Sequence, residues 1–273
     1  IHLKQPYSNQ KYMTQTVARD TKRISIDKHV YNKEKEVLVK PLVLGPGKIR
    51  YSKTQVFSRQ VLIKEGTEIL LGNEVNLIFN DKLLINGSSK KPVIIKASKN
   101  SSFGSVVLRG KKTVGSEISH LNIINGSNGF FELAEFAGSL TLMETSNIKI
   151  KGLNIKSQCE ACFGLNIYKV DDFKLENIKI EHFRESLFKI ELSKGSLINS
   201  TFNSSLQRGL DLMFSDVALK DVTISNCFQS SIKLYKSKIS VDNVILRNGM
   251  LGIDGETKPF RAGLDFESIT RTV

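Results

Sequence analysis

Residues 209–230 read GLDLMFSDVALKDVTISNCFQS, and three short runs within this stretch alternate apolar with polar residues. The apolar positions of the three runs are Leu210 and Leu212, Val217 and Leu219, and Val222 and Ile224. Alternation with a period of two is typical of β-strands that bury one face. Asp221 separates the second run from the third, and an aspartate tolerates the left-handed backbone that a sharp turn needs. The stretch therefore predicts three short strands joined by turns.

The same unit is written five times between Gly138 and Met250. An apolar position of the first strand recurs every 22 to 25 residues, at Leu142, Ile167, Ile190, Leu212 and Leu234. A turn position keeps the same spacing, at Gly152, Asn177, Asn199, Asp221 and Asn243. A fixed period of this length, made of short strands, indicates a β-solenoid. We expect an all-β, single-stranded, right-handed parallel β-helix of about eight coils, with the five apolar positions stacked as one interior ladder.

The chain has 273 residues, a length that suits one solenoid domain. We expect the β-helix to occupy residues 41–273, behind a basic N-terminal arm or lead-in segment at residues 1–40. The formal net charge is +13, and residues 1–60 carry 13 Lys or Arg against four Asp or Glu. Such an arm can dock on an acidic polysaccharide, a lipid surface or an acidic protein surface, or it can simply be solvated. Nucleic acid is the weakest partner class, since no nucleic-acid-binding motif is present.

We expect no cofactor and no metal site. Cys159 and Cys162 form a lone CxxC pair, without the second pair or the histidines at ligand spacing that zinc requires. Cys162 and Cys227 suit interior or turn positions as small apolar residues, with a local disulfide as the alternative if the protein is exported. No run of 18 apolar residues occurs, so we expect no transmembrane segment.

Several segments resemble the opening coils of bacterial exported β-helix proteins of the pectin-lyase-like superfamily. They are residues 44–47 (LGPG), 61–71 (VLIKEGTEILL), 83–87 (LLING) and 91–95 (KPVII), and residues 209–213 (GLDLM) resemble the recurring strand of those repeats. The chain is most similar to β-helix regions that accompany spore-coat-protein-H-type domains of envelope proteins. The resemblance implies export to the periplasm, the cell surface or the medium, and a substrate that lies along one outward strand face. Its motifs are architectural and imply no catalytic residues.

The repeat places outward residues of the first strands in two columns. The first column is Thr141, Asn166, Lys189, Asp211 and Lys233, and the second is Met143, Tyr168, Glu191, Met213 and Tyr235. Neighbours within a column are expected about 5 Å apart, and the two columns about 7 Å apart. We predict that substrate-binding residues lie in this patch, namely Asn166, Tyr168, Lys189, Glu191, Asp211, Lys233 and Tyr235.

The patch has the residue types that glycan chemistry uses. Lysines can hold a uronate carboxylate, tyrosines can stack on a sugar face, and a column carboxylate can move a proton. The alternative is that opposite charges stacked along a ladder only relieve repulsion between neighbouring coils. Asp171 and Asp172 are adjacent and so point to opposite faces, which does not suit the paired carboxylates of an inverting glycosidase. His120 and His182 fall at a turn and a coil end, where a structural role is expected.

Two functions remain open. The first is an exported β-helix module that binds, and in one version also modifies, an acidic cell-envelope or extracellular polysaccharide. The second is a non-catalytic structural or protein-docking module of a larger envelope or surface protein, with the basic arm as its contact. Whether the chain is an enzyme of the polysaccharide lyase or hydrolase type stays open. The nearly uniform coils after Lys174 lack a long loop to wall a cleft, which favours binding or scaffolding.

Overall fold

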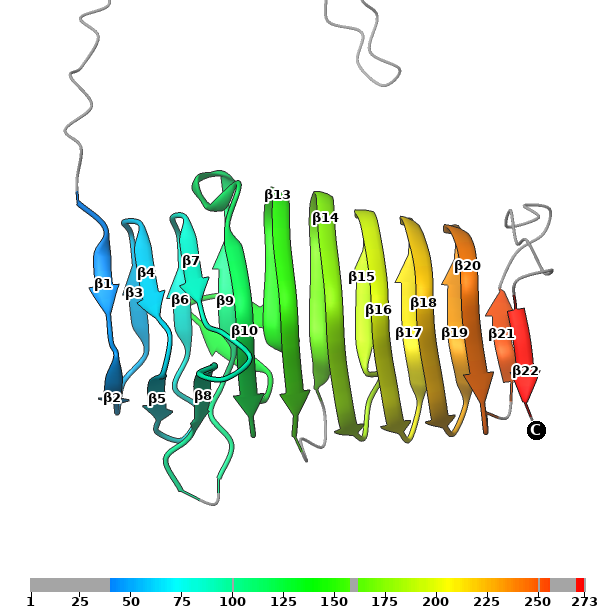
Figure 1. Ribbon diagram of the computed structural model, residues 1–273, viewed down its shortest axis with the longest axis horizontal. Coiled ribbons are helices and arrows are strands. Elements are labelled where there is room, and N and C mark those ends of the chain that lie inside the picture. Colours follow the sequence, from blue (N-terminus) through cyan, green and yellow to red (C-terminus); the bar gives the residue numbers. More distant parts are fainter. Residues whose placement is uncertain (1–39, 100, 158–161, 250, 256–268, 273) are drawn as a thin grey trace, which may run out of the picture. The chain divides into compact units, whose positions relative to one another are not determined.

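The alternating runs wind into a parallel β-solenoid of about nine turns (Figure 1). The computed structural model describes residues 40–99, 101–157, 162–249, 251–255 and 269–272. The predicted all-β parallel fold is confirmed, with about nine coils where the repeats indicated about eight. The expected N-terminal arm, apart from Lys40, lies outside the described residues. No helix among the described residues is long and apolar enough to cross a membrane.

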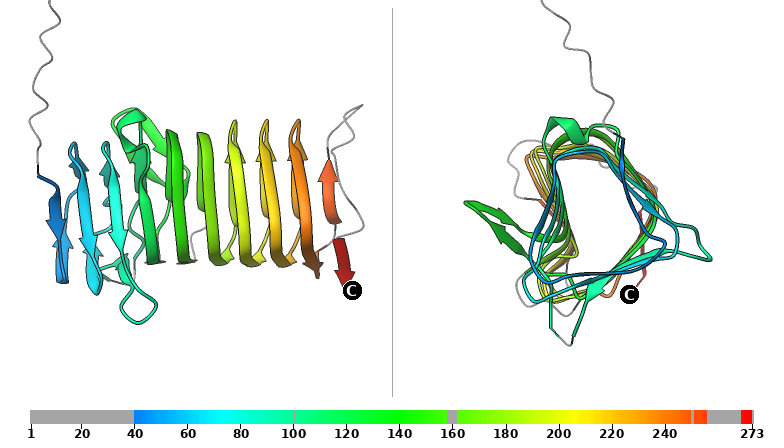
Figure 2. Two further views of the ribbon diagram at one scale, coloured as in Figure 1. Left: turned by 45° about the horizontal axis from the view of Figure 1, so that its top comes forward. Right: turned by 90° about the vertical axis from the view of Figure 1, so that its left-hand side faces the viewer.

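Each coil has three sides, and the end-on view of Figure 2 shows a three-sided tube. Face 1 begins with β1 (Leu42–Leu44), β4 (Val61–Lys64) and β7 (Leu83–Asn86). Face 2 begins with β2 (Gly47–Tyr51), β5 (Thr67–Leu71) and β8 (Val93–Ala97). Face 3 begins with β3 (Gln55–Phe57), β6 (Leu77–Phe79) and β9 (Val106–Arg109).

Later coils are built from longer strands that turn the corner from face 1 to face 2 without a break. These strands are β10 (Glu117–Ile124), β13 (Gly138–Lys156), β14 (Phe163–Phe183), β16 (Lys194–Ser205), β18 (Asp216–Cys227) and β20 (Lys238–Arg247), of which β13 and β14 already begin on face 3. Face 3 continues with β15 (Phe188–Glu191), β17 (Arg208–Met213), β19 (Ser230–Tyr235) and β21 (Leu251–Gly255), and face 2 with β22 (Ile269–Thr272). Two features interrupt the coils, namely the 3-10 helix η1 (Lys111–Thr113) and the antiparallel hairpin of β11 (Gly129–Phe131) and β12 (Ala134–Phe136).

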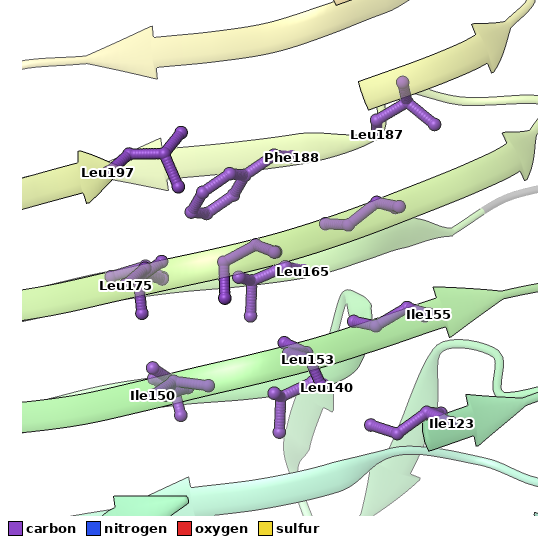
Figure 3. Packing of buried hydrophobic residues seen from close by; sticks show 14 of the residues in the cluster. Ile123, Leu140, Ile150, Leu153, Ile155, Leu165, Leu175, Leu187, Phe188 and Leu197 are labelled. Carbon is purple, nitrogen blue, oxygen red and sulfur yellow. The ribbon is translucent and has the colours of Figure 1, made fainter. Parts of the chain in front are cut away.

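Apolar ladders fill the tube. The predicted interior ladder pairs in register and is buried throughout, at Leu142, Ile167, Ile190, Leu212 and Leu234. A second ladder, on face 1, contains Ile150, Leu175 and Leu197 (Figure 3). Burying one such side chain is worth about 1.5–3 kcal/mol. The ladders therefore tie each coil to the next through packing as well as through strand pairing.

The predicted turn positions form the corner between face 1 and face 2. From β10 onward, six residues there have positive φ angles between 48° and 72°, namely His120, Gly152, Asn177, Asn199, Asp221 and Asn243. The Asn199 amide donates a hydrogen bond to Oδ1 of Asn177, and the Asn243 amide donates to Oδ1 of Asp221 at 2.7 Å. Asn and Asp suit this corner because they tolerate the left-handed backbone. Their side chains also form hydrogen bonds with the residue at the equivalent corner position of the neighbouring coil. The turn prediction, including His120, is confirmed.

The corner between face 3 and face 1, called corner 3 below, uses the same conformation with larger side chains. Its left-handed residues are Glu144, Lys169, Leu192, Phe214 and Lys236, with φ between 46° and 53°. Buried serines follow directly behind them at Ser193, Ser215 and Ser237. Each serine hydroxyl accepts a hydrogen bond from a backbone N–H of the preceding coil and donates to the carbonyl two residues before it. The serines thereby satisfy backbone groups where the strands part at the corner.

The two described cysteines differ. Cys162 is buried and disulfide-bonded, so the disulfide alternative applies to it, while Cys159 lies outside the described residues. Cys227 is a free thiol in the core, as predicted. Burial raises the pKa of the Cys227 thiol to about 12.

We predict that replacing Asn199 by alanine destabilises the solenoid more than replacing it by glycine. Both changes remove the hydrogen bond to Asn177, but only alanine is penalised in the left-handed conformation, by about 1–2 kcal/mol. Urea unfolding followed by circular dichroism measures the difference between the two variants. Equal midpoints, or a lower midpoint for Asn199→Gly, would contradict the assignment of this corner.

We also predict that iodoacetamide at pH 8 leaves Cys227 unmodified in the folded protein. With a pKa of about 12, only roughly one thiol in ten thousand is ionised at that pH, and the side chain is buried. Mass spectrometry should show alkylation only when urea unfolds the chain. Rapid stoichiometric labelling of the folded protein would show that this part of the core opens.

Candidate functional site

The two predicted columns lie side by side on the outer surface of face 3. Strand pairing aligns Thr141, Asn166, Lys189, Asp211 and Lys233 as column A, and Met143, Tyr168, Glu191, Met213 and Tyr235 as column B. Parallel pairing sets a separation of about 4.8 Å between neighbouring strands. The predicted adjacency of these residues is confirmed, while their role in binding substrate stays a prediction.

Column A is less accessible than its outward direction suggested. Thr141 is 1% exposed and packs into a hydroxyl cluster with Ser105, whose Oγ lies 3.3 Å from the Thr141 Oγ1. Asn166 and Asp211 are also buried, at 9% and 8% exposure. Lys189 and Lys233 are half-buried. The lysines are therefore the members of column A that a ligand can reach most easily.

Charged groups on face 3 are partly compensated. Lys189 Nζ lies 3.1 Å from Oε2 of Glu191 and 5.6 Å from the centre of the Phe163 ring. Arg208 Nη1 lies 3.2 Å from Oδ2 of Asp211. Each of these two ion pairs lies within a single strand, so relief of repulsion between neighbouring coils, the alternative reading of the columns, stays a prediction. The same contacts fix where these side chains point.

Aromatic and basic side chains gather at corner 3, both in column B and at the left-handed residue that follows it. We call this surface the corner strip, and it consists of Tyr168, Lys169, Leu192, Phe214, Tyr235 and Lys236. The rings of Phe214 and Tyr235 meet edge to face with centres 5.2 Å apart, and Lys236 Nζ lies 5.6 Å and 5.5 Å from those centres. Ammonium groups over aromatic faces are held in place while remaining accessible to anions.

The other end of the strip repeats this pairing of a lysine with an aromatic ring. Lys169 Nζ lies 4.9 Å from the centre of the Tyr168 ring and 3.6 Å from Oε1 of Glu144. A hydrogen bond with Tyr168 raises the pKa of Lys169, and the charge of Glu144 raises it further. The strip therefore carries a lysine beside aromatic rings at each end, Lys169 and Lys236.

A hollow of about 480 Å³ lies beside the strip. Leu192, Phe214 and Lys236 line it from corner 3, and a column of Lys194, Asp216 and Lys238 lines it from face 1. The serine ladder of Ser193 and Ser215 lies between the two sides. The hollow thus combines an apolar wall with a wall of alternating charge. An apolar wall suits the face of a sugar ring, and a charged wall suits the hydroxyl and acidic groups at its edge.

Apart from Tyr168 and Tyr235, the residues of the corner strip and of the hollow were missed by the prediction from the sequence. A signal was present, since large residues such as Leu192 and Phe214 stand where the chain turns and recur with the coil period. Phe214 is 44% exposed and Leu192 is 45% exposed, so neither belongs to the core. Non-glycine residues held in the left-handed region are often found at functional surfaces. His182 lies exposed at a left-handed corner, as a coil-end residue should.

No cluster of three or more His, Cys, Asp or Glu side chains among the described residues is placed to hold a metal ion. The seven predicted site residues contribute hydrogen-bonding, charged and aromatic groups to face 3. Such a surface can bind an extended polar ligand along the axis of the solenoid.

Comparisons with known proteins give no family. No family model and no curated protein matches the chain. The enzymatically active domain of tailspike protein 2 from bacteriophage CBA120 is similar in structure, at TM-score 0.30 and 12% identity over 76% of this chain and 38% of that chain. The catalytic unit of a GH87 α-1,3-glucanase from Streptomyces thermodiastaticus strain HF3-3 aligns at TM-score 0.25 and 11% identity, over 85% of this chain and 61% of that one. Likenesses this weak carry no argument about ligand or activity, and the resemblance to spore-coat-protein-H-associated regions stays a prediction.

Proposed function

We propose that this chain is an exported binding module that holds an acidic polysaccharide lengthwise along column B, the corner strip and the adjoining hollow. The observation that carries the proposal is the line of aromatic rings and lysines that follows the solenoid axis across β14, β15, β17 and β19. Successive coils repeat about every 4.8 Å, a length of the same order as one sugar unit. A linear glycan laid along the strip meets an aromatic ring or a leucine at each coil and a lysine at both ends.

The chemistry of the surface fits an anionic sugar polymer. Lys189 and Lys233 from face 3, with Lys194, Lys236 and Lys238 around the hollow, supply cations for carboxylate or sulfate groups. The exposed rings of the strip offer apolar faces on which sugar rings stack. Binding of this kind weakens as salt screens the lysines.

We propose binding without turnover. Glu191 and Asp211, the carboxylates of the two columns, are each engaged by a cation, Lys189 and Arg208 respectively. In these pairs the carboxylates orient the cations that face a ligand. A general acid or base must instead reach the reacting group of the substrate. This arrangement supports recognition more directly than proton transfer.

Export is part of the proposal. A disulfide at Cys162 supports it, because disulfides persist in the oxidising environment of secreted and periplasmic proteins. An acidic polysaccharide of the cell envelope or the surroundings would be met in that environment. The glycan array described next identifies the class of polysaccharide.

We predict that a Lys189→Ala/Lys233→Ala double variant binds acidic glycans at least tenfold more weakly than the natural chain. Loss of a charge-assisted hydrogen bond costs about 1.5–3 kcal/mol, and a tenfold change corresponds to about 1.4 kcal/mol. A glycan array with uronate-containing, sulfated and neutral polymers, read at low and at physiological salt, measures the effect. Binding to the acidic polymers should fall as salt rises, and neutral polymers should bind weakly in both conditions.

The matched control is Lys174→Ala/Lys220→Ala, which removes two lysines from face 1 of the same two coils. Lys220 lies 3.2 Å from Asp242, a distance close to the 3.1 Å between Lys189 and Glu191, although the Lys220 pair is more exposed. This control should keep binding within about twofold of the natural chain. If no acidic glycan binds, or binding is lost only when residues 1–40 are removed, the face is not the site and a protein contact of the basic arm becomes the working function.

A further inference from the structure

A second hollow lies at the N-terminal end of column B, beneath the hairpin of β11 and β12. The hairpin follows β10 and projects from the outside of the solenoid (Figure 2). At its base, Phe136 is fully buried against Ile78 and Val107 on the outer surface of face 3. This small apolar cluster fixes the hairpin over the earlier coils. The hollow beside it measures about 550 Å³, within the size range of pockets for small organic ligands.

Arg109 lines this hollow and is held in one orientation. Its Nε donates a hydrogen bond to Oδ1 of Asn80 at 2.9 Å, and its guanidinium carbon lies 5.9 Å from the ring centres of both Phe131 and Phe136. Among the described residues Arg109 forms no ion pair. A guanidinium fixed in this way loses little freedom on binding and presents further N–H donors in a fork that matches an oxyanion.

The remaining lining strengthens the positive character of the hollow. Lys111 and Lys112 enter from η1 with exposed side chains, so three cations line the site. Its carboxylate, Glu144, already pairs with Lys169 at 3.6 Å. Ala134 and Met143 provide an apolar wall. The hollow therefore suits a small molecule with one apolar face and one anionic group.

The hollow is continuous with the proposed glycan surface. Arg109 pairs in register with Met143, and Met143 pairs with Tyr168, so Arg109 belongs to column B. The hairpin cluster covers the adjacent column A here, since Ile78 and Val107, which are in register with Thr141, are fully buried beneath it. A polymer lying along column B would thus have the hairpin at its side at this point, where Ala134 of β12 lines the hollow.

We propose that the hollow around Arg109 is an end subsite, which binds a terminal sugar unit through a carboxylate, sulfate or phosphate group. This inference rests on the proposed function and adds to it that the acidic group of the chain end is recognised. The guanidinium of Arg109 receives the oxyanion, Lys111 and Lys112 add charge at the rim, and Met143 contacts the sugar body. A polymer bound in this way has a defined starting position on the solenoid.

The test is isothermal titration of the intact chain, at low salt, with glucuronic acid, glucose 6-sulfate, glucose 6-phosphate and uncharged glucose. We expect at least one charged sugar to bind one-to-one and glucose not to bind. Arg109→Gln should weaken that binding about tenfold or more, and Lys111→Ala/Lys112→Ala about threefold or more, from loss of charge-assisted contacts. The charged sugar that binds most tightly identifies the class of oxyanion.

The matched control is Lys90→Ala/Lys91→Ala, because these are also adjacent, exposed lysines between two strands. It should leave the affinity within about twofold of the natural chain. Arg109→Gln also removes contacts to the hairpin, so the exposed Lys111 and Lys112 pair serves as the test that does not depend on the hairpin fold. Unchanged affinity in either pocket variant, or absence of binding by every charged sugar, overturns the end subsite.

The glycan array and the titrations, run on the same variants, distinguish failure of the end subsite from failure of the proposed function. If acidic polymers bind and depend on Lys189 and Lys233 while no charged monosaccharide binds, the polymer surface stands and the end subsite is overturned. If a charged monosaccharide binds through Arg109 while no polymer binds, the hollow is a small-anion site and the polymer function is overturned.

Discussion

Parallel hydrogen bonding between successive coils is the constraint on which the rest of the molecule depends. It requires each strand to lie directly over its equivalent, so coils must keep a nearly constant length and each side chain must tolerate a like neighbour about 4.8 Å away. Inside the tube this condition is met by apolar ladders such as Leu142 to Leu234. Outside, it produces columns of polar and charged groups. The proposed ligand-binding surface and the core are two consequences of one register.

The corners show how the chain meets this constraint with different side chains. At the corner between faces 1 and 2, Asn and Asp take the left-handed conformation and bond to their equivalents in the next coil. At corner 3 the same conformation is held by Leu192, Phe214 and Lys236, which place their side chains toward solvent. Buried serines behind them satisfy the backbone. The first corner thus joins neighbouring coils by hydrogen bonds, while corner 3 presents large side chains on the surface.

Two periods in the sequence, two residues within a strand and about 22 residues between coils, were enough to predict the features that repeat in every coil. The interior ladder, the first corner and the two columns are of this kind. The hairpin of β11 and β12 breaks the period, and its packing over Ile78 and Val107 depends on contacts between distant parts of the chain. The burial of Thr141 likewise involves a neighbour outside the repeats, Ser105. Arg109 could be assigned to column B only once the strand pairing was known.

Along the surface, the sign of the charge changes from coil to coil. Lys189, Asp211 and Lys233 alternate on face 3, and Lys194, Asp216 and Lys238 alternate on face 1 of neighbouring coils. In the proposed binding mode, a polyanion that moves by one coil at these positions meets the opposite sign of charge, and a movement of two coils, about 10 Å, meets the same sign again. The proposed surface therefore favours polymers whose charges are spaced by about two coils.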